Sequence, residues 1–330
     1  MTNTLFLCTL FDSNYLSRGV LTYKSLKEVS TNFHLYILAF DDLTYSTLLN
    51  LNLENVTVIA LFEFETDEML RVKNNRTRTE YCWTSASVFT KFCINRYDLP
   101  HIVYIDADMY FYSDPSVLLT ENLSADVMIT HHRYSPRYDV SRLSGKYCVQ
   151  WVAFRNTQNG RKILSDWASD CMKWCYNRHE NGLFGDQKYL DYWPEKYLGI
   201  HEINNFGAGI AMWNIQQYKI SSGGDLMFKQ NSQKVIPVFY HYHYLKLFNN
   251  QSVELGRIVI EHSLIEYFYK PYIQKLISTE IYLKDAVSWD TKIGKIKPPN
   301  GLKHLLISFY RKLRNEYHIY KLKSWNLKYA

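Results

Sequence analysis

A regular alternation of short apolar runs with amphipathic stretches over residues 4–105 constrains the fold more than any other feature of the sequence. Short apolar runs predict buried strands, and apolar positions that recur at three and four predict helices. The expected strands cover residues 4–10, 33–40, 56–61 and 101–105, and the expected helices cover residues 15–29, 43–51 and 88–97. Strands that alternate with helices form βαβ units around a parallel sheet. We therefore expect an α/β fold in which helices cover both faces of a mostly parallel, Rossmann-like sheet.

The second half of the sequence is less regular. Strands are expected at residues 127–130, 148–154 and 235–244, and helices at residues 160–178, 186–192 and 261–277. Pro271 is expected to interrupt the last of these helices, because proline has no backbone N–H to donate. Residues 297–301 include two prolines and a glycine, and they form the clearest linker in the chain.

Composition excludes several classes of protein. With 330 residues, 47% of them hydrophobic and 21% charged, the chain can bury a large core, which excludes disordered and disulfide-scaffold proteins. Its six cysteines include no C-x-x-C pair, and we expect free thiols in a reducing compartment. The N-terminus has no basic region, and the apolar run after it is too short for a signal peptide or a membrane span. A cytoplasmic protein is therefore expected.

The excess positive charge is confined to the end of the chain. The net charge is +6, and residues 303–330 alone carry seven basic residues and one acidic residue. The rest of the chain is balanced between the two signs. A nucleic-acid-binding protein more often carries its basic stripe on the folded domain, so this distribution weakens that interpretation.

The most informative segment joins the strand at residues 101–105 to two acids, Asp106 and Asp108. Ligands bind at the carboxyl ends of strands in open α/β sheets. Two carboxylates this close repel each other unless a cation lies between them, and hard divalent cations such as Mg²⁺ or Mn²⁺ prefer oxygen ligands. A solvated turn or a helix N-cap is the alternative. The position after a strand, and before a helix that residues 113–115 would open, favours the cation site.

Four segments, taken in order along the chain, are the basis of a family resemblance. They read L-F-L-C-T-L-F-D-S-N-Y from Leu5, Y-I-D-A-D-M-Y-F-Y-S-D-P from Tyr104, G-D-Q-K-Y-L from Gly185 and H-Y-H from His241. Together they resemble the GT-A fold glycosyltransferases. The group they resemble most is the retaining, family 8-like group that contains glycogenin and the bacterial lipooligosaccharide galactosyltransferases. The resemblance covers residues 4–250, and the D-A-D and G-D-Q segments are its most specific parts.

The resemblance assigns several residues to a nucleotide-sugar donor. The D-S-N-Y segment matches the part that holds the base and the ribose, which implies donor contacts for Asp12 and Tyr15, with Thr9 and Asn14 close by. The chemistry agrees, because a carboxylate can accept from uracil N3–H and a tyrosine ring can stack on a base. For Tyr15 alone, packing on the sheet is the alternative.

Two lysines are weaker donor candidates. Lys91, on the helix before the D-A-D strand, would contact the diphosphate or the sugar, although a solvated helix face is the more common place for such a lysine. Lys246 falls one position short of the lysine in the family pattern H-F-x-G-x-x-K, in which Tyr244 replaces the glycine.

The resemblance also implies a metal site. Asp106 and Asp108 match the D-x-D motif as metal ligands, and Asp106 would also contact the donor. His241 matches a third metal ligand best, with His243 as the alternative. Alternate residues of a strand share a face, so both histidines can line the cleft. A structural, hydrogen-bonded histidine is the other possibility for each. The expected cofactor is Mn²⁺ or Mg²⁺.

Asp186 and Gln187 match an acid–amide pair near the anomeric carbon of the sugar. The resemblance implies that Asp186 binds sugar hydroxyls and that Gln187 stabilises positive charge on the β face of the donor sugar. For Asp186, an N-cap role is the alternative. The segment that borders the sugar in the family differs here, because Cys148 and Gln150 stand at its Asn and Gly positions. The donor sugar is therefore left open.

Together these matches imply a metal-dependent hexosyltransferase. It would move a hexose from a nucleotide sugar, a UDP-sugar first of all, to a saccharide acceptor with retention of configuration. The expected role is in the synthesis of bacterial surface polysaccharide or lipopolysaccharide. A catalytically silent membrane-surface binding protein on the same fold would have damaged metal ligands, whereas these are intact. A nucleotidyltransferase would carry a glycine-rich phosphate loop after the first strand, and residues 11–15 contain no glycine.

The expected organisation has three parts. These are a catalytic domain at residues 1–250, a helical extension at residues 251–297 and a basic, aromatic tail at residues 298–330. The linker would let the tail orient on its own, and its composition suits a helix in the headgroup layer of an anionic membrane. A helix docked on its own domain is the alternative. The expected partners are the donor, a saccharide or lipid-linked saccharide acceptor, and the inner face of the cytoplasmic membrane, but no nucleic acid.

Overall fold

A seven-stranded sheet runs through the centre of the molecule, in a computed structural model that describes residues 4–327. The strand order is β3-β2-β1-β4-β7-β6-β8. These strands are β1 (Leu5–Phe11), β2 (Phe33–Ala39), β3 (Val56–Ala60), β4 (His101–Ile105), β6 (Val127–His131), β7 (Tyr147–Arg155) and β8 (Ile200–Glu202). The first four strands in this order are parallel, and β7 is antiparallel to both of its neighbours. The mostly parallel α/β sheet expected from the sequence is confirmed.

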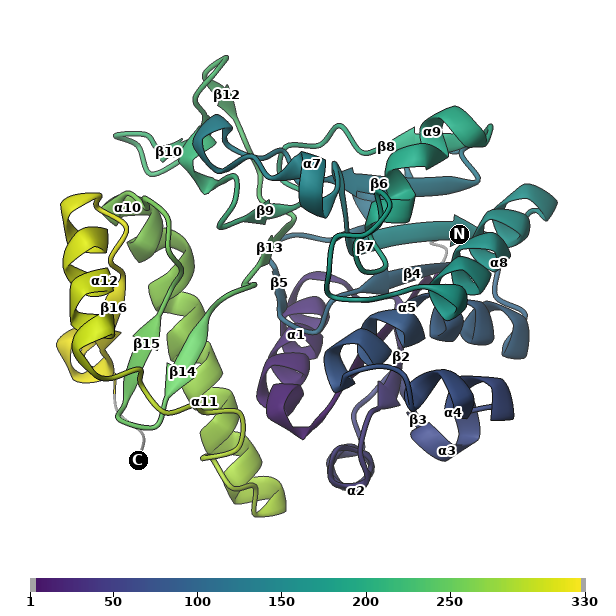
Figure 1. The fold of residues 1–330 in the computed structure, drawn as a ribbon, viewed down its shortest axis with the longest axis horizontal. Helices are drawn as coiled ribbons and strands as arrows, with labels where there is room; N and C mark the ends of the chain where they lie inside the picture. Colours follow the sequence, from purple (N-terminus) through teal and green to yellow (C-terminus); the bar gives the residue numbers. More distant parts are fainter. Residues whose placement is uncertain (1–3, 328–330) are drawn as a thin grey trace.

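Helices cover both faces of this sheet (Figure 1). Alternate residues of a strand point to opposite faces, so Leu5 and Leu7 of β1 pack against one set of helices and Cys8 and Leu10 against another. The first face is covered by α1 (Leu16–Val29) and α2 (Asp42–Leu51), and the second by α3 (Leu61–Phe64), α4 (Asp67–Lys73), α5 (Arg78–Arg96) and α8 (Gln158–Lys173). Burial on both faces is the reason that β1 is a continuous apolar run.

Helix α5 is longer than the sequence analysis predicted, since it begins at Arg78 rather than at residue 88. Its N-cap is Thr77, whose side chain accepts from the Glu80 amide while the Glu80 carboxylate accepts from the Thr77 amide. This reciprocal pair is a capping box. The T-x-x-E signature is visible in the sequence. The first turns of α5 are largely polar, so apolar periodicity alone did not predict them.

Short elements connect the main ones. The helical turns are η1 (Ser13–Tyr15), α6 (Ser116–Leu119), η2 (Pro136–Tyr138), α7 (Ser141–Ser144), η3 (Lys188–Tyr192), α9 (Trp193–Lys196) and η4 (Ile215–Gln217). The strands β10 (Tyr218–Ile220), β11 (Leu226–Phe228) and β12 (Gln233–Lys234) form an antiparallel sheet of their own. The helix predicted at residues 186–192 is the 3₁₀ helix η3.

A small sheet follows the D-A-D turn. Its central strand β13 (Phe239–His241) lies antiparallel to β5 (Met109–Phe111) and parallel to β9 (Ile210–Ala211). The strand predicted at residues 235–244 is therefore much shorter than expected. Only Phe239–His241 pair with neighbouring strands, and the chain turns sharply soon afterwards at Tyr244, which has a φ of +68°.

The helices after residue 260 also differ from expectation. They are α10 (His262–Leu264), the π-helical turn η5 (Ile265–Tyr269) and α11 (Lys270–Val287). Pro271 does not end the helical segment; it lies in the first turn of α11, directly after the π-helical turn η5. In η5 the backbone hydrogen bonds span five residues instead of four, so the departure from a regular α-helix lies just before Pro271 and not at it.

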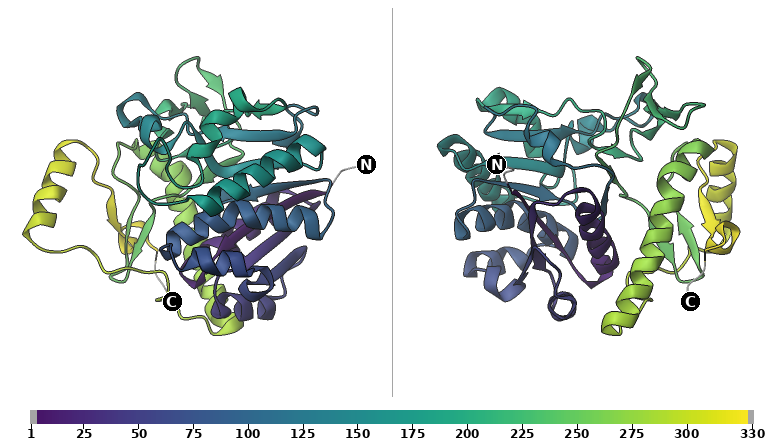
Figure 2. Two further views of the ribbon diagram at one scale, coloured as in Figure 1. Left: turned by 45° about the vertical axis from the view of Figure 1, so that its right-hand side comes forward. Right: turned by 180° about the vertical axis from the view of Figure 1, so that it is seen from behind.

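The C-terminal segment folds back onto a hairpin instead of standing free. The hairpin strands are β14 (Lys246–Phe248) and β15 (Ser252–Glu254), and β16 (Ile319–Lys321) pairs with β15 before the short helix η6 (Leu322–Trp325). Helix α12 (Leu302–Leu313) lies at the outer edge of the molecule, beyond α10 and α11, and Figure 2 shows the same arrangement from two other sides.

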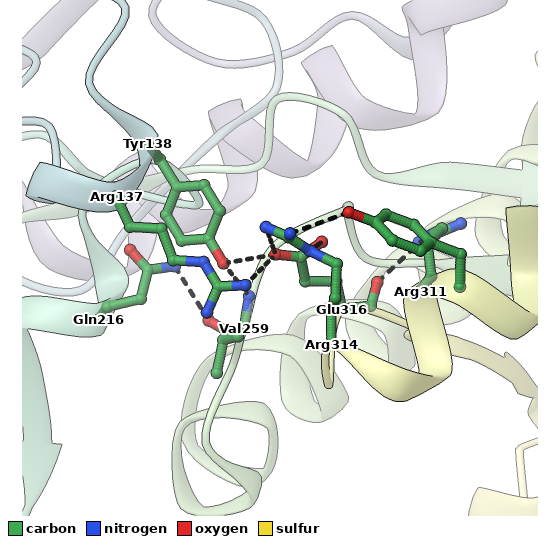
Figure 3. Close-up of polar contacts among 8 residues, drawn as sticks. Arg137, Tyr138, Gln216, Val259, Arg311, Arg314 and Glu316 are labelled. Atoms are coloured by element: carbon green, nitrogen blue, oxygen red, sulfur yellow. Dashed lines mark hydrogen bonds and ion pairs between the residues drawn. The ribbon is translucent and has the colours of Figure 1, made fainter.

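Buried charges fix this segment in place. The Arg311 guanidinium lies 2.7 Å from Glu254, with both side chains buried. Glu316 accepts from Arg137 at 2.8 Å and from the Tyr138 hydroxyl at 3.2 Å (Figure 3). The tail is thus held in one orientation, in contrast to the independent tail expected beyond the proline linker. Within residues 4–327, no helix has the length and apolar composition needed to cross a bilayer.

Candidate active site

The D-A-D turn at the end of β4 is held by its neighbours on two sides. The Asp106 amide donates to the Gln150 carbonyl of β7 at 3.3 Å. The Thr22 hydroxyl of α1 lies 2.8 and 2.7 Å from the main-chain carbonyl oxygens on either side of Asp108. Buried backbone groups of the turn are thereby satisfied, which fixes the position from which both aspartates project.

Strand β13 brings His241 to this turn, because His241 pairs with Met109 across the small sheet. Its Nε2 lies 3.0 Å from Asp108 Oδ1 and 3.6 Å from Asp106 Oδ2. Its Nδ1 lies 3.0 Å from Gln150 Oε1. An amide oxygen can only accept, so Nδ1 carries a proton in this arrangement and Nε2 faces the carboxylates.

A second imidazole reaches the same place. The candidate ligand atoms of Asp108, His241 and His243 all lie within 4.8 Å of one another. The Trp213 ring packs beside both histidines, with ring centroids 5.4 Å from His241 and 5.9 Å from His243. The structure therefore brings both candidate histidines to Asp108. The two imidazoles and the carboxylate form one group of candidate metal ligands.

Burial acts on all three ionisable groups, yet their pKa values move in different directions. Burial raises the pKa of Asp106 to about 6, against the effect of His241 and together with that of Asp108. For Asp108 burial also opposes the charge, but His241 outweighs it and the pKa falls to about 2. Burial would lower the pKa of His241, and the Asp108 carboxylate reverses this and raises it well above its usual value. An imidazolium thus supplies the positive charge that the paired carboxylates require.

The turn after β1 lies at the same edge of the sheet. The Asp12 carboxylate accepts from the Asn14 amide at 2.9 Å and from Arg78 Nε at 2.7 Å. The same guanidinium donates to Asp41, at the end of β2, at 3.1 Å. Tyr15 is 43% exposed, so its ring is accessible from solvent. Asp12, Asn14 and Tyr15 are therefore together at the carboxyl ends of the parallel strands, where α/β sheets bind their ligands.

A segment from beyond α11 closes one side of this turn. Gly294 has a φ of +77°, and a Cβ at this position would lie 2.4 Å from the Asn14 carbonyl oxygen. Only glycine fits such a close approach. Next to it, Lys295 pairs with Glu280 of α11 at 2.9 Å, and both side chains are buried. Residues beyond 251 thus contribute a wall to the predicted donor site.

Asp186 and Gln187 lie in the loop before η3. Burial, with Asp106 nearby, raises the pKa of Asp186 to about 8. The Trp167 indole donates to the Asp186 carbonyl at 3.0 Å, which fixes the loop. The Gln187 side-chain amide donates to the Ser144 carbonyl at the end of α7. Asp186 therefore shares the electrostatic environment of the D-A-D turn, and Gln187 is joined to the segment that precedes β7.

Comparison with known proteins identifies the family. A model described as glycosyl transferase family 8 matches residues 7–165, which include the Asp12 turn and the D-A-D turn. The chain is 30% identical over 280 residues to the uncharacterized protein YfnD of Bacillus subtilis strain 168, across 83% of this chain and 89% of YfnD. The chain belongs to glycosyl transferase family 8. It is therefore a glycosyltransferase.

One further sequence relative and two solved structures are also similar to this chain. The uncharacterized protein YfnF of Bacillus subtilis strain 168 is 29% identical over 244 residues, 71% of this chain and 80% of YfnF. The galactosyltransferase LgtC, in complex with donor and acceptor sugar analogs, superposes with a TM-score of 0.52 at 12% identity, over 83% of this chain and 96% of LgtC. The bifunctional glycosyltransferase WbbM gives 0.51 at 14% identity, over 88% of this chain and 52% of WbbM. These two structures share the GT-A fold of the family-8 chain.

Three predicted donor residues of the glycosyltransferase occupy different surroundings. Thr9 is buried near the end of β1, and its hydroxyl has no hydrogen-bond partner within the described part of the chain. Lys91 lines a groove of about 740 Å³ between α4, α5 and α8, beside Phe92, so the structure does not bring it to the D-A-D turn. Lys246 begins β14, opposite Glu254.

The sequence did not reveal the contacts that three other residues make at this site. Arg78, which bridges the acids after β1 and β2, lies ten residues before the predicted start of its helix. Gln150 was expected near the sugar, whereas its amide oxygen contacts His241, 91 positions away. Trp213 has a buried indole N–H without a partner among residues 4–327. No local pattern marks the last two, because both depend on contacts made by the fold.

Proposed function

We propose that the glycosyltransferase transfers a hexose from a UDP-sugar to a saccharide acceptor, with a divalent metal ion and with retention of the anomeric configuration. The convergence of Asp106, Asp108, His241 and His243 beside the Asp12 turn carries this proposal. The similarity in fold to LgtC, whose structure is a complex with donor and acceptor sugar analogs, supports a donor and an acceptor for this chain as well.

The candidate ligand atoms of the metal site favour Mn²⁺ over Mg²⁺. Two imidazole nitrogens from His241 and His243 join carboxylate oxygens from Asp108 and Asp106, and imidazole suits transition metals better than it suits Mg²⁺. A bound divalent ion would neutralise charge that develops on a departing diphosphate. Gln150 would hold His241 with Nε2 directed toward the ion.

Asp186 and Gln187 are the residues proposed to act at the sugar. Burial raises the pKa of Asp186 to about 8, so its carboxyl group is mostly protonated near neutral pH. The protonated group can donate to a sugar hydroxyl, and the ionised group can accept from one. Gln187 would exchange its hydrogen bond to Ser144 for the donor sugar. The amide oxygen is the group suited to positive charge at the anomeric carbon.

A screen of UDP-sugars for Mn²⁺-dependent release of UDP tests the proposal. The wild-type chain should release UDP from at least one UDP-hexose, and removal of the ion with EDTA should stop the release. Asp108→Asn should abolish it, whereas Asp98→Asn, at an exposed position before β4, should leave it unchanged. NMR of the fresh product should show the donor's anomeric configuration.

The same screen separates the competing functions. Binding of Mn²⁺ and UDP without turnover of any UDP-sugar, with or without a saccharide acceptor, would favour a silent binding protein. Release of pyrophosphate from a nucleoside triphosphate in the presence of a sugar phosphate would favour a nucleotidyltransferase. Either result would overturn the proposed transfer reaction.

We also propose that helix α12 attaches the enzyme to an anionic membrane, at the cytoplasmic face, where it would meet a lipid-linked saccharide acceptor. The helix exposes a set of large apolar side chains at helical spacing: Leu302, Leu305, Leu306, Phe309 and Leu313. An apolar helix face flanked by basic residues suits the headgroup layer of a bilayer. The synthesis of a surface polysaccharide is the process that such a location would serve.

Fewer cations are available for this contact than the composition suggests. Lys303, Lys312, Lys321 and Lys323 are exposed. Arg311 is buried against Glu254 and Arg314 pairs with Glu316, while Lys328 lies outside the described residues. Each exposed lysine near an anionic surface contributes about 1 kcal/mol, so salt should weaken the attachment.

Vesicle flotation tests the attachment with the full chain. The wild type should float with phosphatidylglycerol-containing vesicles at low salt and much less at high salt. Leu305→Ser/Leu306→Ser should lose flotation, whereas Leu123→Ser/Leu198→Ser, a matched pair of exposed leucines elsewhere, should keep it. Equal flotation of the two double variants would refute a role for α12.

A further inference from the structure

Arg18 is a buried arginine with no described acid in direct contact, and its charge acts only at longer range on Asp108, whose pKa it helps to lower. Its side chain is on α1, and the residue is 6% exposed. Its two hydrogen bonds both go to main-chain oxygens, Nη1 to Asn14 at 3.4 Å and Nη2 to Leu245 at 3.2 Å. Among residues 4–327, no carboxylate oxygen lies within 4.0 Å of its guanidinium nitrogens. A positive charge has therefore been buried without a counter-charge in contact.

Such an arrangement is costly unless an anion completes it. Removing a charge from water without a partner is among the most unfavourable steps in folding. A guanidinium carries five N–H donors, and main-chain oxygens accept only part of what Arg18 offers. The guanidinium carbon also lies 4.7 Å from the centre of the Tyr15 ring, within the range of a cation–π contact. The group is preorganised for a ligand that brings negative charge.

The surroundings of Arg18 indicate where that ligand lies. Arg18 is in the first turn of α1, directly after the turn that follows β1, and helix N-termini attract anions through their free N–H groups. Its bond to Leu245 ties it to the segment that carries His241 and His243. The guanidinium thus lies between the Asp12 turn and the histidine cluster, which is the span that a nucleotide diphosphate would cross.

Neither candidate lysine takes this place. Lys246, which the family pattern offered for the diphosphate, starts β14 and stands opposite Glu254 in the strand register of the hairpin. Lys91 lines the separate groove beside α5 and α8. Arg78 is already shared between Asp12 and Asp41. Of the cations considered for the donor, Arg18 is the one that is buried without an acid in contact, and its bond to Leu245 places it beside the histidine cluster.

We propose that Arg18 binds the diphosphate of the nucleotide sugar and stabilises the charge on it as it departs. This inference rests on the proposed function. In the transfer, the bond between the anomeric carbon and the β-phosphate oxygen breaks with its electron pair on that oxygen. The acceptor oxygen bonds to the anomeric carbon, and its proton passes to the departing diphosphate. Arg18 stays protonated throughout and donates N–H groups to phosphate oxygens.

Calorimetric titration in the presence of Mn²⁺ tests the role with three probes: UDP, UMP and inorganic pyrophosphate. Arg18→Met should weaken the binding of UDP and pyrophosphate about 10- to 100-fold, and that of UMP less, because hydrogen bonds to a charged group are lost. Arg18→Lys should retain part of the affinity, since it keeps the charge without the planar fork. Arg155→Met is the matched control, because Arg155 also donates to main-chain oxygens but lies at the far end of β7.

The outcomes separate this inference from the proposed function. If the wild type binds pyrophosphate with Mn²⁺ but not UDP, the uridine donor is wrong and Arg18 is tested on pyrophosphate alone. If Arg18→Met binds pyrophosphate and UDP as the wild type does, the inference about Arg18 is wrong, and the proposal of a UDP-sugar donor is unaffected. An equal loss for UMP and UDP, with a melting temperature lowered as in Arg155→Met, would assign Arg18 a structural role only and would also overturn it.

Discussion

The imidazole of His241 is oriented by Gln150, whose side-chain oxygen lies 3.0 Å from Nδ1 in the interior of the molecule. This contact leaves Nε2 for the aspartates of the D-A-D turn. Second partners of this kind set the tautomer and direction of histidines that bind metal ions. The glutamine thus determines how the histidine meets the carboxylates, although the two residues lie on different sheets.

Replacement of Gln150 should weaken metal binding without removing a metal ligand. Gln150→Leu keeps a similar volume but offers no acceptor, so Mn²⁺ affinity should fall about 10- to 100-fold. Gln150→Glu keeps an acceptor oxygen and should lose less. Mn²⁺ titration followed by electron paramagnetic resonance measures both. A leucine variant that binds Mn²⁺ as tightly as the wild type would show that Gln150 does not orient His241.

Replacement of Gln187 should affect turnover more than donor binding. An interaction made mainly in the transition state lowers kcat and leaves ground-state binding almost unchanged. We expect Gln187→Ala to lower kcat about 100-fold, the size found for a single group that stabilises developing charge. Steady-state kinetics and UDP titration on the same variant supply both quantities. Equal losses in rate and in UDP affinity would instead indicate that Gln187 holds the loop through Ser144.

The Arg311–Glu254 pair should make a large contribution to stability. Arg311→Met removes the nearest cation from the buried Glu254 carboxylate and leaves only the more exposed Arg257 at 3.5 Å, so it should lower the free energy of unfolding by about 3 kcal/mol. Arg311→Met/Glu254→Gln should recover part of the loss. Urea denaturation measures the three chains. Lys162→Met breaks an exposed pair on α8 and should leave stability almost unchanged. A similar small effect for Arg311→Met would contradict the prediction.

Acid should destabilise the fold through His101 at the start of β4. Burial, and to a lesser degree Arg155, lowers the pKa of His101 to about 4, and its Nε2 accepts from the Phe6 amide at 3.4 Å. The unfolded chain binds this proton at the usual pKa of 6.5, so the contribution is complete above pH 6.5 and is lost as the pH falls toward 4. The loss should reach about 3 kcal/mol.

Urea denaturation at several pH values measures this loss. His101→Gln keeps an acceptor for the Phe6 amide without titrating, so its stability should fall less between pH 6.5 and 4. Parallel pH profiles for the wild type and His101→Gln would exclude His101 as the cause.

The parallel half of the sheet and the D-A-D turn could be predicted from sequence because their signals are local. A continuous apolar run predicts a buried strand such as β1. Asp106 directly follows β4, and the sequence predicted both ends of that strand correctly. The turn at Asp12, which directly follows β1, is equally local. These features need no knowledge of which distant segments meet.

The rest of the site depends on contacts between distant segments. His241 could be expected beside Asp108 only through the family resemblance, because the two meet where β13 pairs with β5 and a three-residue strand has too few positions to show an alternation. Tyr244 adopts a left-handed φ of +68°, where the family pattern has glycine, and a sequence alone does not reveal that a bulky residue tolerates it. Arg18 was overlooked because a helical arginine usually faces solvent.

The contact of Gly294 with Asn14 has a consequence for how the protein is made. A ribosome releases the Asp12 turn early, but the glycine that packs on it is residue 294 of 330. During synthesis the turn after β1 therefore stays open on one side until residue 294 has emerged and packed against Asn14. The surface around this turn is therefore completed late, and a chain terminated before residue 294 would leave the Asn14 carbonyl uncovered on that side.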